Sequence, residues 1–121
     1  PVQEVKENGV EKQIDPADAL GYLVRGHAYR DLGQYQRAIQ SYDKAIQLNP
    51  DFRLAYLNRG FVYSGLGQYQ RAIEDYDKAI HLDPDNAAAY VDRGLALENL
   101  GQINLAKEDH KQACKLDRKF C

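Results

Sequence analysis

Apolar residues recur at helical spacing along most of the chain. In its middle section, Ala72, Ile73, Tyr76, Ala79 and Ile80 follow one another at intervals of one or three, and charged residues occupy positions between them. Such intervals place the apolar side chains on one face of an α-helix. The pattern predicts a helix from about Tyr69 to Leu82, which ends before Pro84 because the residue before proline disfavours the α region.

A second helix is expected just before this one. It would run from about Asp51 to Gly65, with Asn49 as its cap and Pro50 in its first turn, where the missing N–H has no consequence. Leu66-Gly67-Gln68 then makes the turn into the next helix. The two helices and the turn form a helix–turn–helix unit.

This unit occurs three times, with a period of 34 residues. About 22 of 34 positions are identical between residues 19–52 and 53–86, and about 13 between 53–86 and 87–120. A unit that cannot bury its own apolar face must stack on its neighbours. The repeat therefore predicts an elongated stack of helix pairs with a concave surface, an architecture that binds other molecules far more often than it performs chemistry.

Small residues indicate where the helices cross. Gly60 lies in the middle of a predicted helix, where glycine is about 1 kcal/mol less favourable than alanine. Gly26 and Gly94 stand at the same place in the other copies, so the partner helix is expected to leave no room for a side chain there. Repeated tyrosines are expected to fill the core around this crossing.

These residues resemble the tetratricopeptide repeat, whose pattern combines aromatic, glycine, alanine and proline residues at set places. The second copy supplies Tyr56, Gly60, Tyr63, Ala72, Tyr76, Ala79 and Pro84. The resemblance implies an all-α, right-handed α-solenoid of three repeats with a concave groove, over residues 15–52, 53–86 and 87–121. One departure is shared by all copies, since Arg25, Arg59 and Arg93 stand where the family often has leucine.

The two ends of the chain depart from the repeat. Lys107, His110 and Cys114 replace apolar or aromatic residues of the earlier copies, so the last helix is expected to be a polar capping helix. Residues 1–14 lack the pattern, although Ile14-Asp15-Pro16 matches Leu48-Asn49-Pro50. They are expected to form an N-terminal tail or the remnant of an earlier helix.

The resemblance implies that the first helix of each pair lines a peptide-binding groove. Residues on that face vary between the copies, so the scaffold does not dictate them. The candidate groove residues are Leu23, His27, Arg30, Leu57, Asn58, Phe61, Val91, Asp92, Leu95 and Glu98. Some of the apolar ones could instead only pack between neighbouring helices.

Family members that grip C-terminal carboxylates use lysines, an arginine and asparagines on this face. Here Leu23 and His27 stand where a lysine and an asparagine belong, and Ala88 and Asp92 where a lysine and an arginine belong. Only Asn58 matches. A clamp for chaperone tails is therefore not expected.

Cys114 and Cys121 are the two cysteines of the chain. They could form a disulfide if the last helix ends near Leu116, because the Cα atoms must come within about 7 Å. Their spacing is similar to that of Sel1-like cysteine-rich repeats, which implies a bridge. Two free thiols remain the alternative. A bridge favours an exported, periplasmic or extracellular protein, and free thiols favour the cytoplasm.

His110 shares a helix face with Cys114, so these two residues and Cys121 could also be considered for zinc. A fourth ligand is missing unless Asp117 serves. We therefore expect no metal site, and we expect no other cofactor.

Composition narrows the function further. The 121 residues carry 16 basic and 18 acidic side chains, interspersed along every copy, which argues against a nucleic-acid surface. No apolar run is long enough to span a membrane. No phosphate loop or nucleophile motif is present, and Glu74, Asp75 and Asp77 are expected to be a solvated polar face.

The leading hypothesis is a non-enzymatic adaptor that binds an extended peptide or a partner helix in the groove. The alternative is a self-associating scaffold segment of a larger protein, a homo-oligomer formed through the exposed first repeat.

Overall fold

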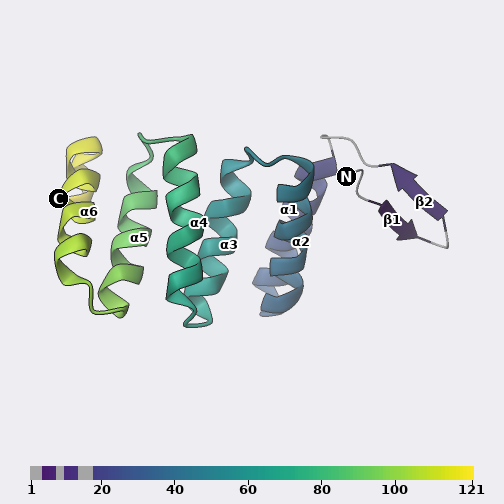
Figure 1. Cartoon of the computed structure of the whole chain (residues 1–121), viewed down its shortest axis with the longest axis horizontal. Coiled ribbons are helices and arrows are strands. Elements are labelled where there is room, and N and C mark those ends of the chain that lie inside the picture. The colour runs from purple at the N-terminus through teal and green to yellow at the C-terminus, as the bar shows by residue number, and fades with distance from the viewer. Residues whose placement is uncertain (1–3, 8–9, 14–17) are drawn as a thin grey trace. The chain divides into compact units, whose positions relative to one another are not determined.

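The computed structural model describes residues 4–7, 10–13 and 18–121 (Figure 1). The chain divides into two compact parts, residues 1–55 and residues 56–121, which are taken in turn. The described residues contain six α-helices, in the helix–turn–helix order that the 34-residue period predicts.

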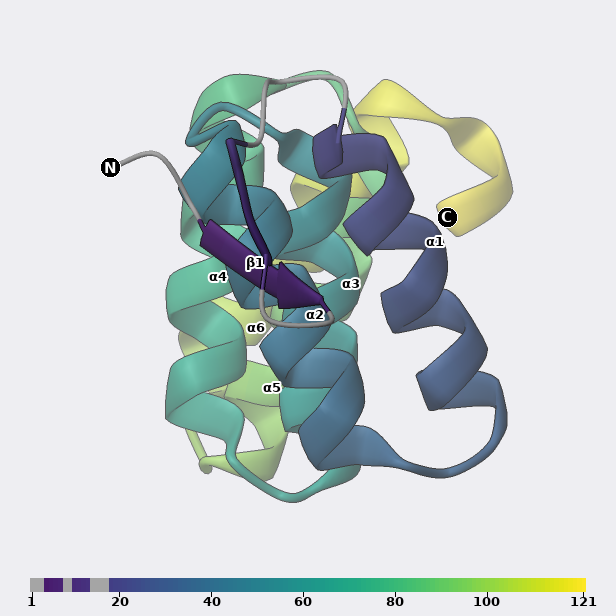
Figure 2. The same cartoon turned by 90° about the vertical axis from the view of Figure 1, so that its right-hand side faces the viewer.

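The first part contains a short β-hairpin and a helix pair. Strands β1 (Glu4–Glu7) and β2 (Val10–Gln13) are antiparallel, with Glu4 opposite Gln13. A tail or a remnant helix was the expectation for residues 1–14, and residues 4–7 and 10–13 form paired strands instead of a helix. The predicted start of the first repeat at Asp15 and Pro16 lies outside the described residues. Helices α1 (Asp18–Asp31) and α2 (Tyr35–Leu48) then lie side by side (Figure 2).

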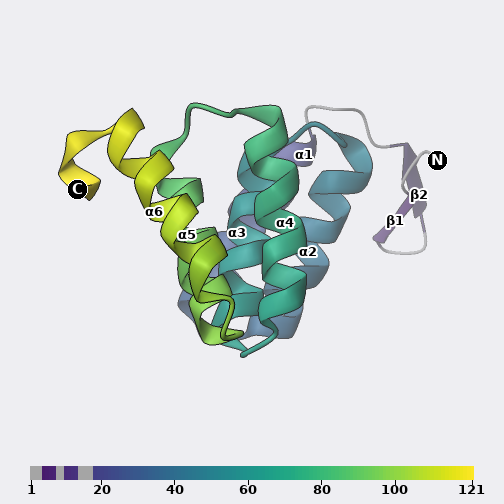
Figure 3. The ribbon, with the colours of Figure 1, turned by 60° about the vertical axis from the view of Figure 1, so that its left-hand side comes forward.

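The second part continues the same alternation of helix and turn. It holds most of α3 (Arg53–Gly65), then α4 (Tyr69–Leu82), α5 (Ala87–Asn99) and α6 (Ile103–Leu116). A short 3₁₀ helix, η1 (Arg118–Phe120), packs on α6 at the C-terminal end (Figure 3). The predicted bounds of α4 are confirmed at both ends.

The turn between α3 and α4 depends on Gly67. Its φ of +76° lies in the left-handed region, which glycine adopts without steric cost. The turn is closed by the Gln68 N–H, which donates to the Tyr63 carbonyl oxygen at 2.9 Å. This arrangement ends α3 after Gly65 and confirms the predicted turn at Leu66-Gly67-Gln68.

The prediction for Asn49 and Pro50 was wrong. Helix α3 begins at Arg53 rather than Asp51, and Pro50 lies in the turn before it. Asn49 Oδ1 accepts from the Asp51 N–H at 3.2 Å, and the Asn49 carbonyl accepts from the Phe52 N–H at 3.0 Å. Asparagine thus closes a local turn on its own backbone, which competes with capping a helix.

Close helix crossings organise the core, as the glycines predict. A Cβ added to Gly60 would lie 2.8 Å from Tyr76 Cε1, and one added to Gly94 would lie 2.9 Å from His110 Cε1. Gly26 faces the ring of Tyr42 in the same way. Around the crossing in the second part, buried side chains from α4, α5 and α6 form two apolar clusters, with Tyr76 in one and Tyr90 in the other.

Candidate functional site

Two large apolar side chains are exposed at matching positions of α3 and α5. Phe61 is 57% exposed and Leu95 is 48% exposed. Leu57 and Val91, which share their helix faces, are half-buried and pack against the core of the second part. Packing between helices therefore explains why Leu57 and Val91 are apolar. Phe61 and Leu95 have no such role and remain as surface residues.

Asp92 brings an acidic group to the same region of α5. It is half-buried, and burial raises the pKa of its carboxyl above the usual value. Burial likewise raises the pKa of Tyr76 to about 12, and the nearby charge of Asp92 adds to this shift. The Tyr76 hydroxyl also lies 3.4 Å from Ser64 Oγ on α3. Ser64 and Asp92 therefore both act on the buried Tyr76 hydroxyl, and they stand three residues from Phe61 and Leu95 on their helices.

Glu98 is held in place by the next helix. His110 Nε2 on α6 donates to Glu98 Oε1 at 2.8 Å, and both side chains are partly exposed. The sequence predicted Glu98 as one of the groove residues. The structure adds that His110 fixes its orientation.

The candidate residues of the first part differ from one another in exposure. Leu23 is only 3% exposed and belongs to the core, so its prediction as a groove residue was wrong. His27 is half-buried, and its Nδ1 is hydrogen-bonded to Tyr42 Oη at 2.8 Å. Burial, helped by the charge of Arg30, lowers the pKa of His27. Arg30 Nε donates to Asp31 Oδ1 at 3.3 Å.

Seven of the ten candidate groove residues therefore lie on α3 and α5 of the second part. They are Leu57, Asn58, Phe61, Val91, Asp92, Leu95 and Glu98. Leu23, His27 and Arg30 lie on α1 of the first part. A single groove that joins all ten stays a prediction.

The sequence did not predict a set of arginine–aspartate ion pairs that recurs between the helices. Asp75 was expected to be solvated, but it is 4% exposed and accepts from Arg59 Nη2 at 2.6 Å and Nε at 2.9 Å. In the next repeat, Asp109 accepts from Arg93 at 2.7 and 2.8 Å. Arg93 Nη1 also donates to Asp77 at 2.9 Å. The recurring 16-residue interval between arginine and aspartate was the signal that could have revealed these pairs.

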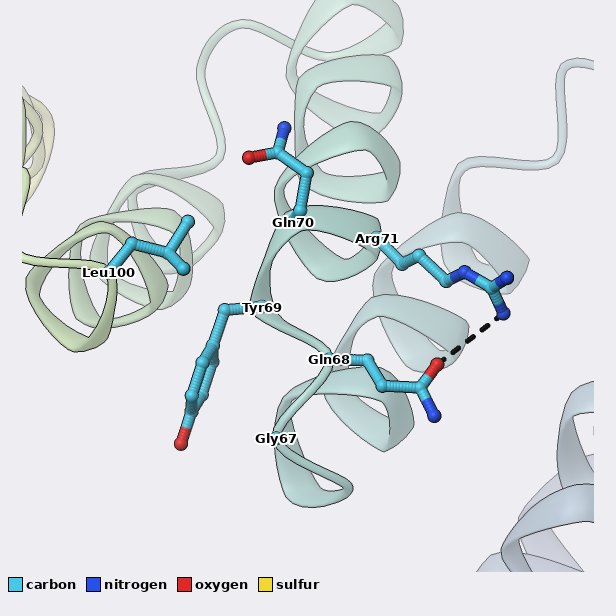
Figure 4. Close-up of a pocket in the computed structure, with 6 residues that line it drawn as sticks. All are labelled: Gly67, Gln68, Tyr69, Gln70, Arg71 and Leu100. Atoms are coloured by element: carbon cyan, nitrogen blue, oxygen red, sulfur yellow. Dashed lines mark hydrogen bonds between the residues drawn. The ribbon is translucent and has the colours of Figure 1, made fainter.

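A hollow of the second part lies at the turn before α4, with a volume of about 530 Å³ (Figure 4). It is lined by residues 67–71 and Leu100, and Arg71 Nη1 donates to Gln68 Oε1 at 3.4 Å across its edge. Gln34, Tyr35, Gln36 and Arg37 line a similar hollow in the first part. Because identical residues recur, this hollow belongs to the scaffold and carries no distinctive chemistry.

The two cysteines form a disulfide. Cys114 lies near the end of α6 and Cys121 follows η1, with their Cα atoms 4.6 Å apart. The helix ends at Leu116, as the bridge requires. Both sulfurs are thus bonded to each other, and the described residues contain no group of three or more His, Cys, Asp or Glu side chains suited to a metal ion. Within the same residues, every helix is too short or too polar to cross a membrane.

Family models match most of the helical region. A model described as "TPR repeat" matches residues 26–67, and models described as "Tetratricopeptide repeat" match residues 54–86 and 75–108. No curated protein sequence gives a significant match to the chain.

Solved structures with the same fold agree with this result. The second TPR of Spaghetti (RPAP3), bound to the HSP90 peptide SRMEEVD, is 31% identical, with 84% of this chain and 94% of that chain covered and a TM-score of 0.82. The second TPR domain of human RPAP3, in complex with the HSP70 peptide SGPTIEEVD, is 32% identical, with 85% and 87% covered and a TM-score of 0.82. The Arabidopsis OM64 TPR domain is 30% identical, with 86% of each chain covered and a TM-score of 0.83. The chain therefore belongs to the tetratricopeptide repeat family, an all-α helical-repeat fold.

Proposed function

We propose that the chain is a non-catalytic adaptor that binds a peptide segment or a partner helix along α3 and α5. The observation that carries this proposal is the pair Phe61 and Leu95, two large apolar side chains exposed at equivalent positions of successive repeats. Contiguous exposed apolar surface marks contact sites, and large side chains at its centre contribute most to binding. The peptides bound by the RPAP3 domains support the same class of function.

The ligand should nevertheless differ from those peptides, which end in Glu-Glu-Val-Asp. Asp92 is half-buried on α5, three residues before Leu95, and Glu98 adds a second acid on the same helix. Acidic groups repel an acidic tail and attract a cation. The preferred ligand is therefore a segment that combines apolar side chains with lysine or arginine.

The test uses ¹⁵N-labelled protein and two peptide classes, with amide shifts of α3 and α5 as the readout. Peptides selected from an array are expected to contain leucine or phenylalanine together with lysine or arginine, and to shift these amides. SRMEEVD should leave them unchanged. Selection of acidic C-terminal peptides that bind at α3 and α5 would overturn the proposal.

Variants that introduce a charge at the exposed apolar positions identify the surface. Phe61→Glu and Leu95→Glu should abolish binding of the selected peptides with little change in Tm, because neither side chain is buried. Leu105→Glu is the matched control, since Leu105 on α6 is also 57% exposed. Equal loss of binding in the control and in Phe61→Glu would show that α3 and α5 are not the site.

The alternative function, in which copies of the chain stack end to end through their terminal repeats, has no comparable structural support. In the second part, Asp77 of one repeat holds Arg93 of the next. In the third repeat, the equivalent of Asp77 is Lys111. In the first repeat, the equivalent of Arg93 is Arg25. A second copy stacked in the same register would place these two cations together, which is unfavourable.

The disulfide supports an exported location for this adaptor. A bridge between Cys114 and Cys121 persists in an oxidising compartment and is rare in the cytosol. We therefore favour a periplasmic or extracellular site of action. Recovery of the native protein from cells with both cysteines alkylated by a cell-permeable reagent would contradict this assignment.

A further inference from the structure

A small basic hollow lies between α1 and α2, and none of its lining residues belongs to the site proposed above. Its volume is about 190 Å³, and its lining includes Arg25, Arg37, Lys44 and Ser41. The lining residues contain three cations and no carboxylate. A volume of this size fits the end of one side chain rather than a larger ligand.

The equivalent positions of the other repeats carry acids. Glu74 and Asp75 stand where the first repeat has Gln40 and Ser41, and the third repeat has Glu108 and Asp109. The seven lining positions hold three cations and two acids in the second repeat, and one cation and two acids in the third. Helices α2 and α4 differ at only three of 14 positions, and two of these differences remove the acids.

The missing acid leaves an arginine without its usual partner. Arg59 and Arg93 each bind an aspartate of the following helix through two hydrogen bonds. Arg25 is exposed and lies over the ring of Tyr22, 5.2 Å from its centroid. Among the side chains of residues 18–121, none offers Arg25 a carboxylate. The place of that carboxylate is taken by Ser41, which is 5% exposed.

We propose that this hollow binds the carboxylate of an aspartate or glutamate from an acidic segment of a partner protein. The fold itself points to a carboxylate, because that is the group held by the equivalent arginine in both other repeats. A planar guanidinium recognises a carboxylate through two parallel hydrogen bonds. Arg37 and Lys44 supply further positive charge around the hollow and favour the approach of an acidic segment.

The test follows backbone amides and the Arg25 Nε–H of the full ¹⁵N-labelled chain by NMR. The probe is the blocked pentapeptide acetyl-Gly-Asp-Glu-Asp-Gly-amide, and the matched peptide with asparagine and glutamine is the control. The acidic peptide should shift signals of residues 22–44, and the neutral peptide should not. Inorganic phosphate is titrated separately. Binding of phosphate without binding of the acidic peptide would overturn the proposal.

Two variants then assign the interaction to the hollow. Ser41→Asp restores the carboxylate of the other repeats, so Arg25 should bind it internally and affinity for the peptide should fall about tenfold. This variant should fold, because Asp75 and Asp109 occupy the same place in their repeats. Arg25→Gln should weaken binding to a similar extent by removing the guanidinium. Unchanged affinity in both variants, or shifts confined to α3 and α5, would contradict the proposed site.

Discussion

The two carboxylate oxygens of Asp75 accept two hydrogen bonds from the guanidinium of Arg59, at a place where the Asp75 side chain is only 6% exposed. Removing one partner of such a pair leaves the other charge poorly solvated. Asp75→Asn should therefore lower the free energy of unfolding by about 2–3 kcal/mol, near or below the lower end of the range for buried pairs, because Arg59 keeps some contact with water. Urea unfolding measures this loss.

Asp77→Asn is the matched control on the same helix. Asp77 is 55% exposed, and its partner Arg93 keeps the pair with Asp109. Exposed pairs contribute about 0–1 kcal/mol, so this variant should change stability by less than about 1 kcal/mol. Equal losses in the two variants would contradict the distinction between the buried and the exposed aspartate.

Gly60 and Gly21 should respond to alanine with opposite signs. Alanine gains about 1 kcal/mol of helix propensity at either site. At Gly60 the new methyl group would overlap the Tyr76 ring, and overpacking of this kind costs typically about 1–3 kcal/mol. A Cβ added to Gly21 would have no heavy atom within 4 Å outside the adjoining helix backbone, and the second repeat already has Ala55 there. Thermal unfolding should show a lower Tm for Gly60→Ala and a higher Tm for Gly21→Ala.

His27 should make the protein less stable at mildly acidic pH. The folded state lowers its pKa below 6.5, chiefly through burial, so the unfolded chain takes up the proton first as pH falls. The contribution of His27 to stability is therefore complete above pH 6.5 and is lost as pH falls toward the folded pKa. His27→Phe, which copies Phe61, should reduce the fall in Tm between pH 7 and pH 5. An identical fall in both proteins would contradict this assignment.

Asp92 should affect the pH dependence of stability in the opposite direction. Burial raises its folded pKa above 3.8, so its ionised form at neutral pH opposes folding, and stability recovers as pH falls through the folded pKa. Asp92→Asn, which copies Asn58, should raise Tm at pH 7. The advantage should disappear below about pH 3.8, where both states of the parent protein are protonated. A constant difference in Tm across this range would point to a cause other than charge.

Reduction of the disulfide should loosen the C-terminal end only. The bridge joins residues seven apart, and a loop of this size contributes roughly 2–3 kcal/mol through the unfolded state. Mild reductant should raise amide hydrogen exchange between Ala106 and Leu116 and leave 56–82 nearly unchanged. Before reduction, the intact mass should be lower than the sequence mass by two hydrogens. A full sequence mass would contradict the bridge.

Prediction from the sequence succeeded where the repeat carried the information. The period located the helix pairs, and the glycines located the crossings, because both follow from local spacing. It failed for Asn49, whose side chain and carbonyl close a local turn instead of capping the next helix. It also failed for Leu23 and Asp75, since helical periodicity does not show which side of a helix a neighbouring helix covers. The partner of Asp75 is 16 residues away and only the folded pair reveals its burial.

The spacing of the aspartates around Arg93 bears on how such an array could be lengthened. Arg93 takes one aspartate from the repeat before it and one from its own repeat. A duplicate of residues 53–86 inserted after Asn86 would bring an arginine and two aspartates at the same positions. The arginines of the duplicate and of the repeat after it would then each have one aspartate in the preceding repeat and one in their own, without further change. The same duplicate placed after the third repeat would meet Lys111 instead of an aspartate. Engineering a longer protein from this chain should therefore begin by insertion in its interior.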